Sequence, residues 1–335
     1  MLPTPKSAHK DTALTNISIL HKNQNYIADR VFPQVPVTKQ SDYYFIFRKG
    51  AWFRNEARVR GPGAVAARGG YPLTDTTYRC EEYAFGHPVP IELLNNADSV
   101  LRPMETGTKF ATDKVLLAKE KIVSDLCMTA GNWTTSDDVQ AAWVKDTDGS
   151  TNTFIADILT QRNVIRQLIG VWPNVLLMDS KTFDQQKQTY SVLERIKYSG
   201  TSGRPADVTP QTLAALFELD EVLIGTSLYS SAEEVVAGTD FTAVDLWETN
   251  ATKGSALLYY RPPAPSIENP SAGYIFNWRG DEGQNSPRIN QNIYRSVRRY
   301  WEAAEKQWVV ECSEYLDAQV TAADAGCLFY DTIVT

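Results

Sequence analysis

The most regular alternation of hydrophobic and polar positions lies in the first limb of residues 41–90. One face of that limb carries Trp52, Arg54, Glu56, Arg58 and Arg60, and the other carries Phe53, Asn55, Ala57 and Val59. A period of two residues is typical of a β-strand, because successive side chains point to opposite faces. We therefore predict a long β-hairpin with a tip at residues 61–70. Its limbs, of about 18 residues each, would be several times the usual strand length.

Charge is divided unevenly between the two limbs of this hairpin. Residues 48–68 hold six basic side chains and one acid, Glu56, whereas the return over residues 75–98 holds five acids and one base, Arg79. A two-stranded ribbon by itself is only marginally stable in water. We therefore expect the hairpin to need a partner surface, with opposite charges pairing across the ribbon or against a second copy of the chain.

Apolar positions at helical spacing follow the hairpin. They are Leu101, Met104, Ala111, Val115, Ala118, Ile122 and Leu126. Their spacing, close to 3.6 residues, predicts a spine helix of about 25 residues. Lys119 and Glu120 fall on its charged outer face.

The remaining pattern predicts a compact lobe and a closing pair of strands. Helices are expected at residues 154–170, 180–197 and 210–219, and strands at 174–178, 221–224, 256–260 and 274–278. This alternation indicates an α+β or α/β lobe that all of these strands help to close. Two β runs at 292–301 and 307–320 are long enough to lie beside the spine helix, and a last strand at 327–334 could return to the lobe.

The residues before the hairpin indicate an arm rather than a domain. Pro3, Pro5, Pro33 and Pro36 interrupt any regular pattern there. Residues 25–37 mix β-branched and aromatic side chains with two of these prolines, which favours an extended edge segment on another surface. We expect this arm to become ordered late, on assembly.

Composition excludes several classes of protein. The chain has 335 residues and is 43% hydrophobic, which is enough to fill a core. No apolar run reaches the roughly 18 residues of a membrane span, and no secretory signal opens the chain, so a cytosolic compartment is expected. The net charge of −7 argues against sequence-specific nucleic-acid binding, which needs a local excess of Lys and Arg.

Candidate catalytic and metal-binding residues are few. The chain has three histidines, and its four cysteines lack paired spacing, which predicts buried free thiols rather than a zinc site or disulfides. The hairpin tip superficially matches a dinucleotide fingerprint, but Pro62 occupies the turn and no amphipathic helix follows. We therefore predict a protein that is not an enzyme and that uses no cofactor or metal.

The order of arm, long hairpin, spine helix, lobe and closing β pair resembles the major capsid protein of tailed bacteriophages, the Hong Kong 97 type coat fold also seen in herpesviruses. The likeness is carried by residues 25–37, the hairpin and its tip, the spine helix and residues 310–334, and it covers nearly the whole chain. It implies an α+β fold. The parts would be an N-terminal arm at 1–40 across neighbouring subunits, an extended β-hairpin loop at 41–90 over an adjacent subunit, a peripheral domain at 91–145 with strands at 287–320, an axial domain at 146–286, and a terminal strand at 321–335 returning to the axial domain.

The resemblance also implies a function. The chain is expected to assemble with itself into pentamers and hexamers of an icosahedral head that encloses double-stranded DNA without sequence-specific binding. Localisation would be the virion, after assembly in the host cytoplasm and without a membrane. A negative net charge suits a container that must not adhere to its cargo. The chain lacks the long helical N-terminal extension of some members, which indicates a separate scaffolding protein; portal and head-decoration proteins are further expected partners.

We expect the strongest subunit contacts from the hairpin and the arm. They are Tyr26, Ile27, Phe32, Trp52, Phe53, Arg54, Arg58 and Arg60. Two alternative functions remain. One is an encapsulin-like nanocompartment of the same fold, which would enclose an enzyme in place of DNA. The other is a hydrolase or nucleotide enzyme using the middle lobe, against which the scarcity of histidine and the lack of a phosphate loop both speak.

Overall fold

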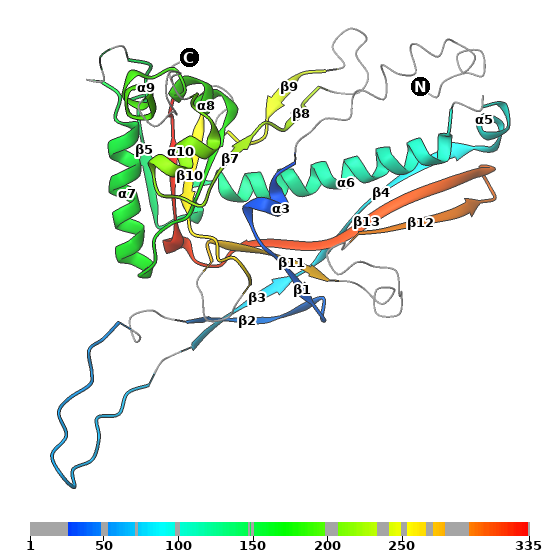
Figure 1. The fold of residues 1–335 in the computed structure, drawn as a ribbon. Helices are drawn as coiled ribbons and strands as arrows, with labels where there is room; N and C mark the ends of the chain where they lie inside the picture. The colour runs from blue at the N-terminus through cyan, green and yellow to red at the C-terminus, as the bar shows by residue number, and fades with distance from the viewer. Residues whose placement is uncertain are drawn as a thin grey trace.

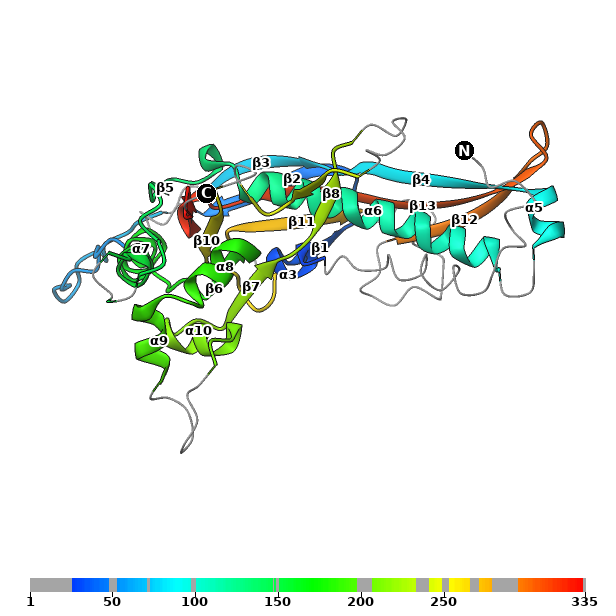
Figure 2. The ribbon, with the colours of Figure 1, turned by 90° about the horizontal axis from the view of Figure 1, so that it is seen from above.

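The structure is a computed structural model. It describes residues 26–47, 53–70, 73–97, 101–146, 148, 151–197, 207–232, 241–248, 253–265, 271–278 and 295–333. Figure 1 shows a long sheet with a helix along it, a compact lobe at one end, and a loop that extends away from both. Figure 2, the view from above, shows that the long sheet and its helix form one elongated layer, with the lobe beside one end.

The long sheet is built on strand β13 (Gln307–Val320). Strands β12 (Arg295–Glu302) and β11 (Gly273–Trp278) pair with it one after the other along one edge, and β4 (Glu81–Pro90) pairs along the opposite edge. Strand β1 (Gln34–Val37) extends the sheet beyond β11 in parallel. Because β4 belongs to this sheet, the expected return limb of the hairpin ends at Arg79.

Helix α6 (Pro103–Cys127) confirms the prediction of a 25-residue spine. It packs on β4 and β13, and the short helix α5 (Ile91–Asn96) precedes it (Figure 1). Its buried face is not wholly apolar, because Lys119 and Glu120 lie there with Ala111 and Val115. The prediction that Lys119 and Glu120 face solvent is therefore wrong.

The lobe contains the second sheet, in the order β5 (Thr135–Asp138), β14 (Gly326–Tyr330), β10 (Ser255–Tyr259), β6 (Val175–Asp179) and β7 (Glu221–Gly225). Helices α7 (Phe154–Ile169), α8 (Ser180–Gln186), α9 (Tyr190–Lys197) and α10 (Pro210–Leu216) surround it (Figure 1). Every residue of β6 and β10 is buried. The lobe thus holds most of the core, and the last strand returns to it as predicted.

Local signals explain several boundaries in the lobe. Asp179 ends β6 and caps α8, since its carboxylate accepts hydrogen bonds from the backbone N–H groups of Lys181 and Thr182. Thr209 and Thr212 form a capping box at the start of α10. The helix predicted over residues 180–197 is interrupted after α8, so α8 and α9 are separate helices.

One prediction about the lobe needs correction. Strand β11 was expected to close the lobe, but it pairs with β1 and β13 in the long sheet. Strand β5, which the pattern did not predict, pairs in parallel with β14 at the edge of the second sheet. A small ribbon of β8 (Leu228–Ser230) and β9 (Ala243–Asp245) lies outside both sheets.

All four cysteines are buried as free thiols. Among the described residues, no His, Cys, Asp and Glu side chains gather in a group of three or more that could hold a metal ion. No helix in the described part of the chain is both long and apolar enough to cross a membrane.

Candidate subunit interface

The root of the hairpin is a two-stranded ribbon, β2 (Ser41–Phe47) with β3 (Leu73–Arg79). One face of it packs on the long sheet. The ring of Tyr78 stacks on Phe276 of β11 with 4.8 Å between centroids, and Tyr44 lies 5.2 Å from the same ring. The hydroxyl of Tyr44 donates to Oε1 of Gln319 on β13 at 3.1 Å. These contacts fix the ribbon to its own chain and set the direction in which the loop departs.

The opposite face of the ribbon has no cover within the described part of the chain. Tyr43 is 62% exposed and Phe45 is 57% exposed. Their cross-strand partners are Thr77 and Asp75. Adjacent aromatic side chains at this exposure are typical of a surface that becomes buried in an assembly.

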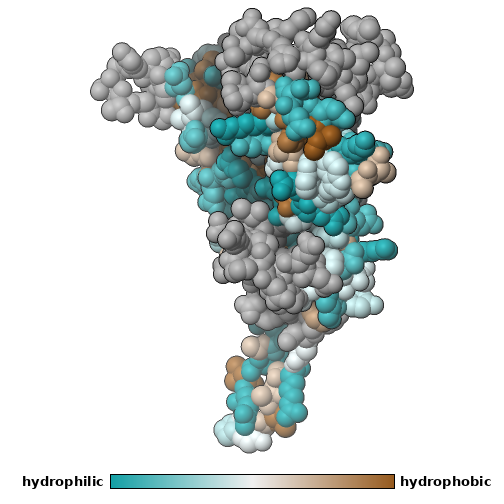
Figure 3. All heavy atoms as spheres, turned by 90° about the vertical axis from the view of Figure 1, so that its right-hand side faces the viewer, coloured by the Kyte–Doolittle hydropathy of each residue, from teal (hydrophilic) through white to brown (hydrophobic). Residues whose placement is uncertain are grey.

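Beyond the ribbon, residues 53–70 run out and back as an extended loop without strand pairing. Figure 1 shows this loop reaching well beyond the lobe and the sheet, and Figure 3 shows it as the narrow projection at the bottom, with hydrophilic and hydrophobic residues side by side. The predicted limbs of about 18 residues are therefore wrong. An alternation of two residues shows which side chains would share a face of a strand. It does not supply the third strand that a two-stranded ribbon needs for stability.

The predicted contact residues of this loop that the structure describes are exposed to solvent. Arg54, Arg58 and Arg60 are exposed, and none of them forms an ion pair within the described residues. Phe53 is 69% exposed and Val59 is fully exposed. Trp52 lies outside the described residues. The contact role of these residues stays a prediction.

Phe53 also braces the start of the loop against the lobe. Gly170, just after α7, has a φ of +79°, and a Cβ atom placed on it would overlap the Phe53 ring. Glycine is needed here twice, for the left-handed backbone and for the close approach of the ring.

We expect Gly170→Ala to lower the free energy of unfolding by about 1 to 2 kcal/mol through backbone strain alone, with a further loss from the displaced ring. Urea unfolding measures the total. Phe53→Ala in the Gly170→Ala background should recover only the loss that comes from the displaced ring. Gly131→Ala is the control, because a Cβ there meets nothing within 4 Å. Equal losses at both glycines would contradict the brace.

The described part of the predicted arm belongs to the body of its own chain. Helix α3 (Ala28–Val31) lies on α6, and β1 follows it into the long sheet. Ile27 is 5% exposed and Phe32 is 0% exposed. This burial does not fit the predicted role of these two side chains as contacts to a neighbour. For residues 27–37 it also corrects the expectation that the arm lies on another subunit.

Glu120 is the residue that fastens this segment to the spine helix. Its carboxylate is 0% exposed. It accepts hydrogen bonds from the backbone N–H groups of Ile27 at 3.0 Å and Ala28 at 2.8 Å, at the start of α3. It also accepts from the hydroxyl of Ser227 and from Nε1 of Trp247, both at 2.8 Å. No ion pair joins Glu120 to a cationic side chain among the described residues, so hydrogen-bond donors satisfy this buried carboxylate.

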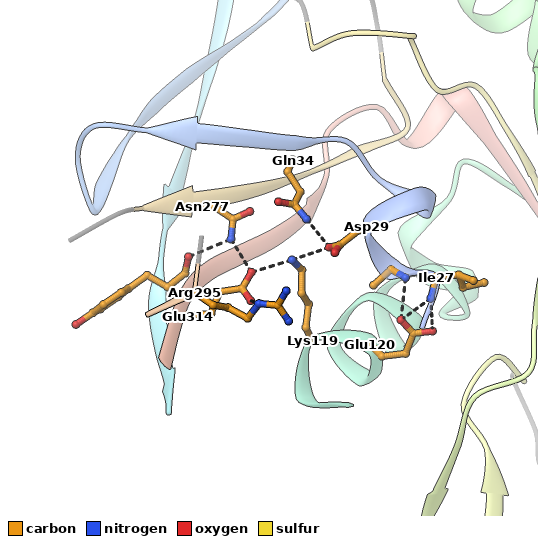
Figure 4. A network of polar contacts seen from close by, with 10 residues as sticks. Ile27, Asp29, Gln34, Lys119, Glu120, Asn277, Arg295 and Glu314 are labelled. Carbon is orange, nitrogen blue, oxygen red and sulfur yellow. Dashed lines mark hydrogen bonds and ion pairs between the residues drawn. The ribbon is translucent and has the colours of Figure 1, made fainter. Parts of the chain in front are cut away.

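Lys119, the preceding residue, makes a second connection (Figure 4). Its Nζ lies 2.6 Å from Oδ1 of Asp29 on α3 and 2.8 Å from Oε1 of Glu314 on β13. The side-chain amide of Asn277 on β11 donates to the same Glu314 oxygen at 3.0 Å. Two adjacent spine residues thus join segments far apart in sequence. We call Lys119, Glu120 and their partners the spine clasp.

Tyr26, the other predicted arm contact, is partly buried, and burial followed by the charge of Asp113 raises its pKa above the usual range.

Little in the sequence indicated the spine clasp. The available hint was spacing, because Lys119 lies four residues after Val115 and three before Ile122, beside the apolar stripe of the helix. Side-chain charge alone favoured solvent exposure.

A second buried carboxylate lies in the lobe. The side chain of Glu248 is 1% exposed, and Lys181 lies 2.7 Å from its Oε1. Burial, helped by the charges of Asp179 and Asp245, raises the pKa of Glu248 from 4.5 to about 7, although Lys181 opposes the shift. The folded chain therefore keeps this proton at a pH where the unfolded chain has lost it.

The contribution of Glu248 to stability should be largest below about pH 4.5 and should be lost as the pH rises through 7. We expect Glu248→Gln to remove this dependence, so that relative to the parent the variant gains on the order of 1 to 3 kcal/mol between pH 5 and pH 8. Thermal unfolding across this range measures it. Asp184→Asn, on an exposed position of α8, is the control. Parallel curves for parent and Glu248→Gln would refute the assignment.

Sequence comparison finds two relatives that span most of the chain. It is 24% identical over 329 residues to the major capsid protein of Pseudomonas phage JBD67, covering 96% of this chain and 97% of that protein. It is 23% identical over 273 residues to the major capsid protein of Burkholderia phage BcepMu, covering 81% and 84%. No family model matches the chain.

Solved structures with the same arrangement extend the comparison. A phage-related protein from Bordetella bronchiseptica superposes with a TM-score of 0.64 at 22% identity, covering 97% of this chain and 98% of that one. The capsid of cyanophage P-SCSP1u superposes with a TM-score of 0.55 at 10% identity, covering 89% of this chain and 86% of that one. An encapsulin from Synechococcus elongatus superposes with a TM-score of 0.51 at 11% identity, covering 97% of this chain and 96% of that one. These findings confirm the resemblance inferred from the sequence: the chain has the α+β Hong Kong 97 type coat fold and is similar in sequence to the major capsid proteins of tailed phages.

Proposed function

We propose that this chain is a major capsid protein, which assembles in many copies into the icosahedral head of a tailed phage around double-stranded DNA. The observation that carries the proposal is the extended loop of residues 53–70, which projects from its own chain with Val59 fully exposed and Val65 77% exposed. Beyond Phe53, which contacts the lobe, these apolar side chains gain burial only against another molecule.

The geometry favours contacts between unlike surfaces of identical copies. The loop projects from one end of the chain, and a patch that receives it must lie elsewhere on the next copy. Contacts of this kind are heterologous, and they close into rings when the rotation between copies divides a full turn. Rings of five and six copies, which are the expected pentamers and hexamers, would tile a closed shell.

In such a ring, the long sheet with α6 would form the peripheral domain and the lobe would form the axial domain around the ring axis. β1 and β11 belong with the peripheral part, because both pair within the long sheet. β14 returns to the axial part through its pairing with β10. The structural role needs no catalytic residue, and the net charge of −7 suits a wall that must not hold its DNA.

The wider assembly follows from the same proposal. A separate scaffolding protein would set the curvature, a portal would occupy one vertex, and head-decoration proteins would bind the outer surface. Assembly would take place in the host cytoplasm, and the virion would be the final location. An encapsulin-like compartment has the same fold, but both sequence relatives are phage capsid proteins, so it is not better supported.

Electron microscopy of the purified full-length chain tests the proposal, alone and with a coexpressed candidate scaffolding protein. We expect rings or closed shells. Small monomers under every condition would overturn the proposal. Shells isolated from infected or induced cells should contain DNA, and shells filled with an enzyme instead would decide for the nanocompartment.

A further inference from the structure

A hollow of about 380 Å³ opens beside the root of the ribbon, between β3, β4, the end of α6 and the second half of β13. Aromatic rings of Tyr78 and Tyr83 line it together with the aliphatic side chain of Ile122. Its size suits one or two side chains of another molecule rather than a whole element of secondary structure. Thr77, on the exposed side of β3, stands at its edge.

Two carboxylates give this hollow its chemical character. Asp317 accepts a hydrogen bond from the backbone N–H of Arg79 at 2.9 Å and from Nε2 of Gln319 at 2.8 Å. Burial, followed by the charge of Glu81, raises the pKa of Asp317. Burial, followed by the charges of Glu81 and Asp317, also raises the pKa of Tyr83, so both carboxylates act on the same space.

Neither carboxylate forms an ion pair with a cationic side chain of the described residues. Arg79 lines the hollow, but its contact with Asp317 is made by its backbone N–H. Aromatic rings beside unpaired carboxylates suit a guanidinium group, which stacks on a ring and forms two parallel hydrogen bonds to a carboxylate. The missing partner is therefore a cation supplied from outside this part of the chain.

The chain displays such cations on its extended loop, where Arg54, Arg58 and Arg60 are exposed within seven residues of one another. They lie beyond the ribbon, whereas the hollow is lined by residues of β3 at its root. We propose that the hollow of one copy receives an arginine of residues 54–60 from the extended loop of a second copy. This inference rests on the proposed capsid function and names the surface that receives the loop.

The two surfaces belong to the same chain but to different places on it. Each copy therefore gives its loop to one neighbour and offers its hollow to another, which is the heterologous arrangement that closes into a ring.

Crosslinking tests the proposed contact directly. Val59→Cys places a thiol on the loop and Thr77→Cys places one at the edge of the hollow, while all four native cysteines are buried. A short bismaleimide added to assembled particles should give a ladder of covalent oligomers on a denaturing gel. Val59→Cys with Ala215→Cys, exposed on α10 of the lobe, is the matched control and should give no ladder. Particles that form normally and crosslink no better with Thr77→Cys than with the control would overturn the inference while leaving the proposed function intact.

Charge reversal gives an independent measurement. Glu81→Arg lies on an exposed strand position and should reduce the particle yield by about tenfold, because it sets like charges against each other. Arg58→Glu in the same chain should restore much of that yield. Full yield from Glu81→Arg alone would contradict the contact, whereas failure of the unaltered chain to assemble would refute the capsid function itself.

Discussion

Deletion of residues 61–70 should leave a chain that folds normally and forms no particles. These residues have no strand pairing and are exposed, so the free energy of unfolding should change by no more than about 0.5 kcal/mol. Assembly should suffer far more. Loss of a central contact of about 2 to 3 kcal/mol per subunit reduces association on the order of 100-fold.

Circular dichroism and urea unfolding would establish the fold of the deletion variant, and electron microscopy with light scattering would measure assembly. A matched variant replaces residues 61–70 with glycine and serine at equal length. It separates the loss of side chains from the loss of reach. Heads of normal size and yield from the deletion variant would defeat the assembly role of the loop.

Glu120→Ala should be the most destabilising single substitution in the body of the chain. It would leave three buried donors without an acceptor, namely the backbone N–H groups of Ile27 and Ala28 and the hydroxyl of Ser227. The Trp247 indole would keep only its hydrogen bond to Oγ of Ser227 at 2.9 Å. Unpaired buried donors are costly, and the removal of one partner from a buried charged network typically costs about 3 to 5 kcal/mol. The loss should appear first as release of α3 and β1.

Urea unfolding measures this loss, and limited proteolysis between residues 26 and 40 detects the released segment. Lys121→Ala is the control on the same helix, because its ion pair with Asp125 is exposed at both side chains. Such a pair contributes about 0.3 to 0.5 kcal/mol. If the two substitutions cost the same, the spine clasp would not be what holds the segment in place.

Much of the fold follows from local sequence. The spine helix, the helices of the lobe and the final strand have apolar spacing or caps within a short window. Asp179 at the start of α8 is an example, since its capping role depends on neighbours two and three residues away. These signals need no knowledge of the tertiary structure.

What the sequence did not provide depends on contacts between distant segments. Glu120 is buried because Ile27 and Trp247 bring donors to it, 93 and 127 residues away. β11 joins the long sheet because β13 offers an edge to it, and its own residues would suit the lobe equally well. Hydrophobic periodicity reports which side of an element is covered, but it does not identify the element that covers it.

In the extended loop, the sequence pattern predicted strands that the structure does not contain, because the alternating residues of the loop lack a partner strand. Under the proposed function, these residues meet a second copy of the chain, so they carry the pattern of a strand while their own chain supplies nothing to pair with. The exposed Val59 and the arginines around it are then an interface and not a strand.

The edge strands of the long sheet bear on how the chain avoids aggregation. Among the described strands, β1 and β12 each lie at a margin, the first with Pro36 and the second with Arg298 and Arg299. Proline removes a backbone donor, and charged side chains such as Arg299 and the Arg298–Glu311 ion pair keep a sheet edge solvated, so these residues discourage edge-to-edge pairing of sheets. Such protection matters most for a protein that accumulates in a cell at high concentration, because random aggregation would otherwise compete with ordered growth.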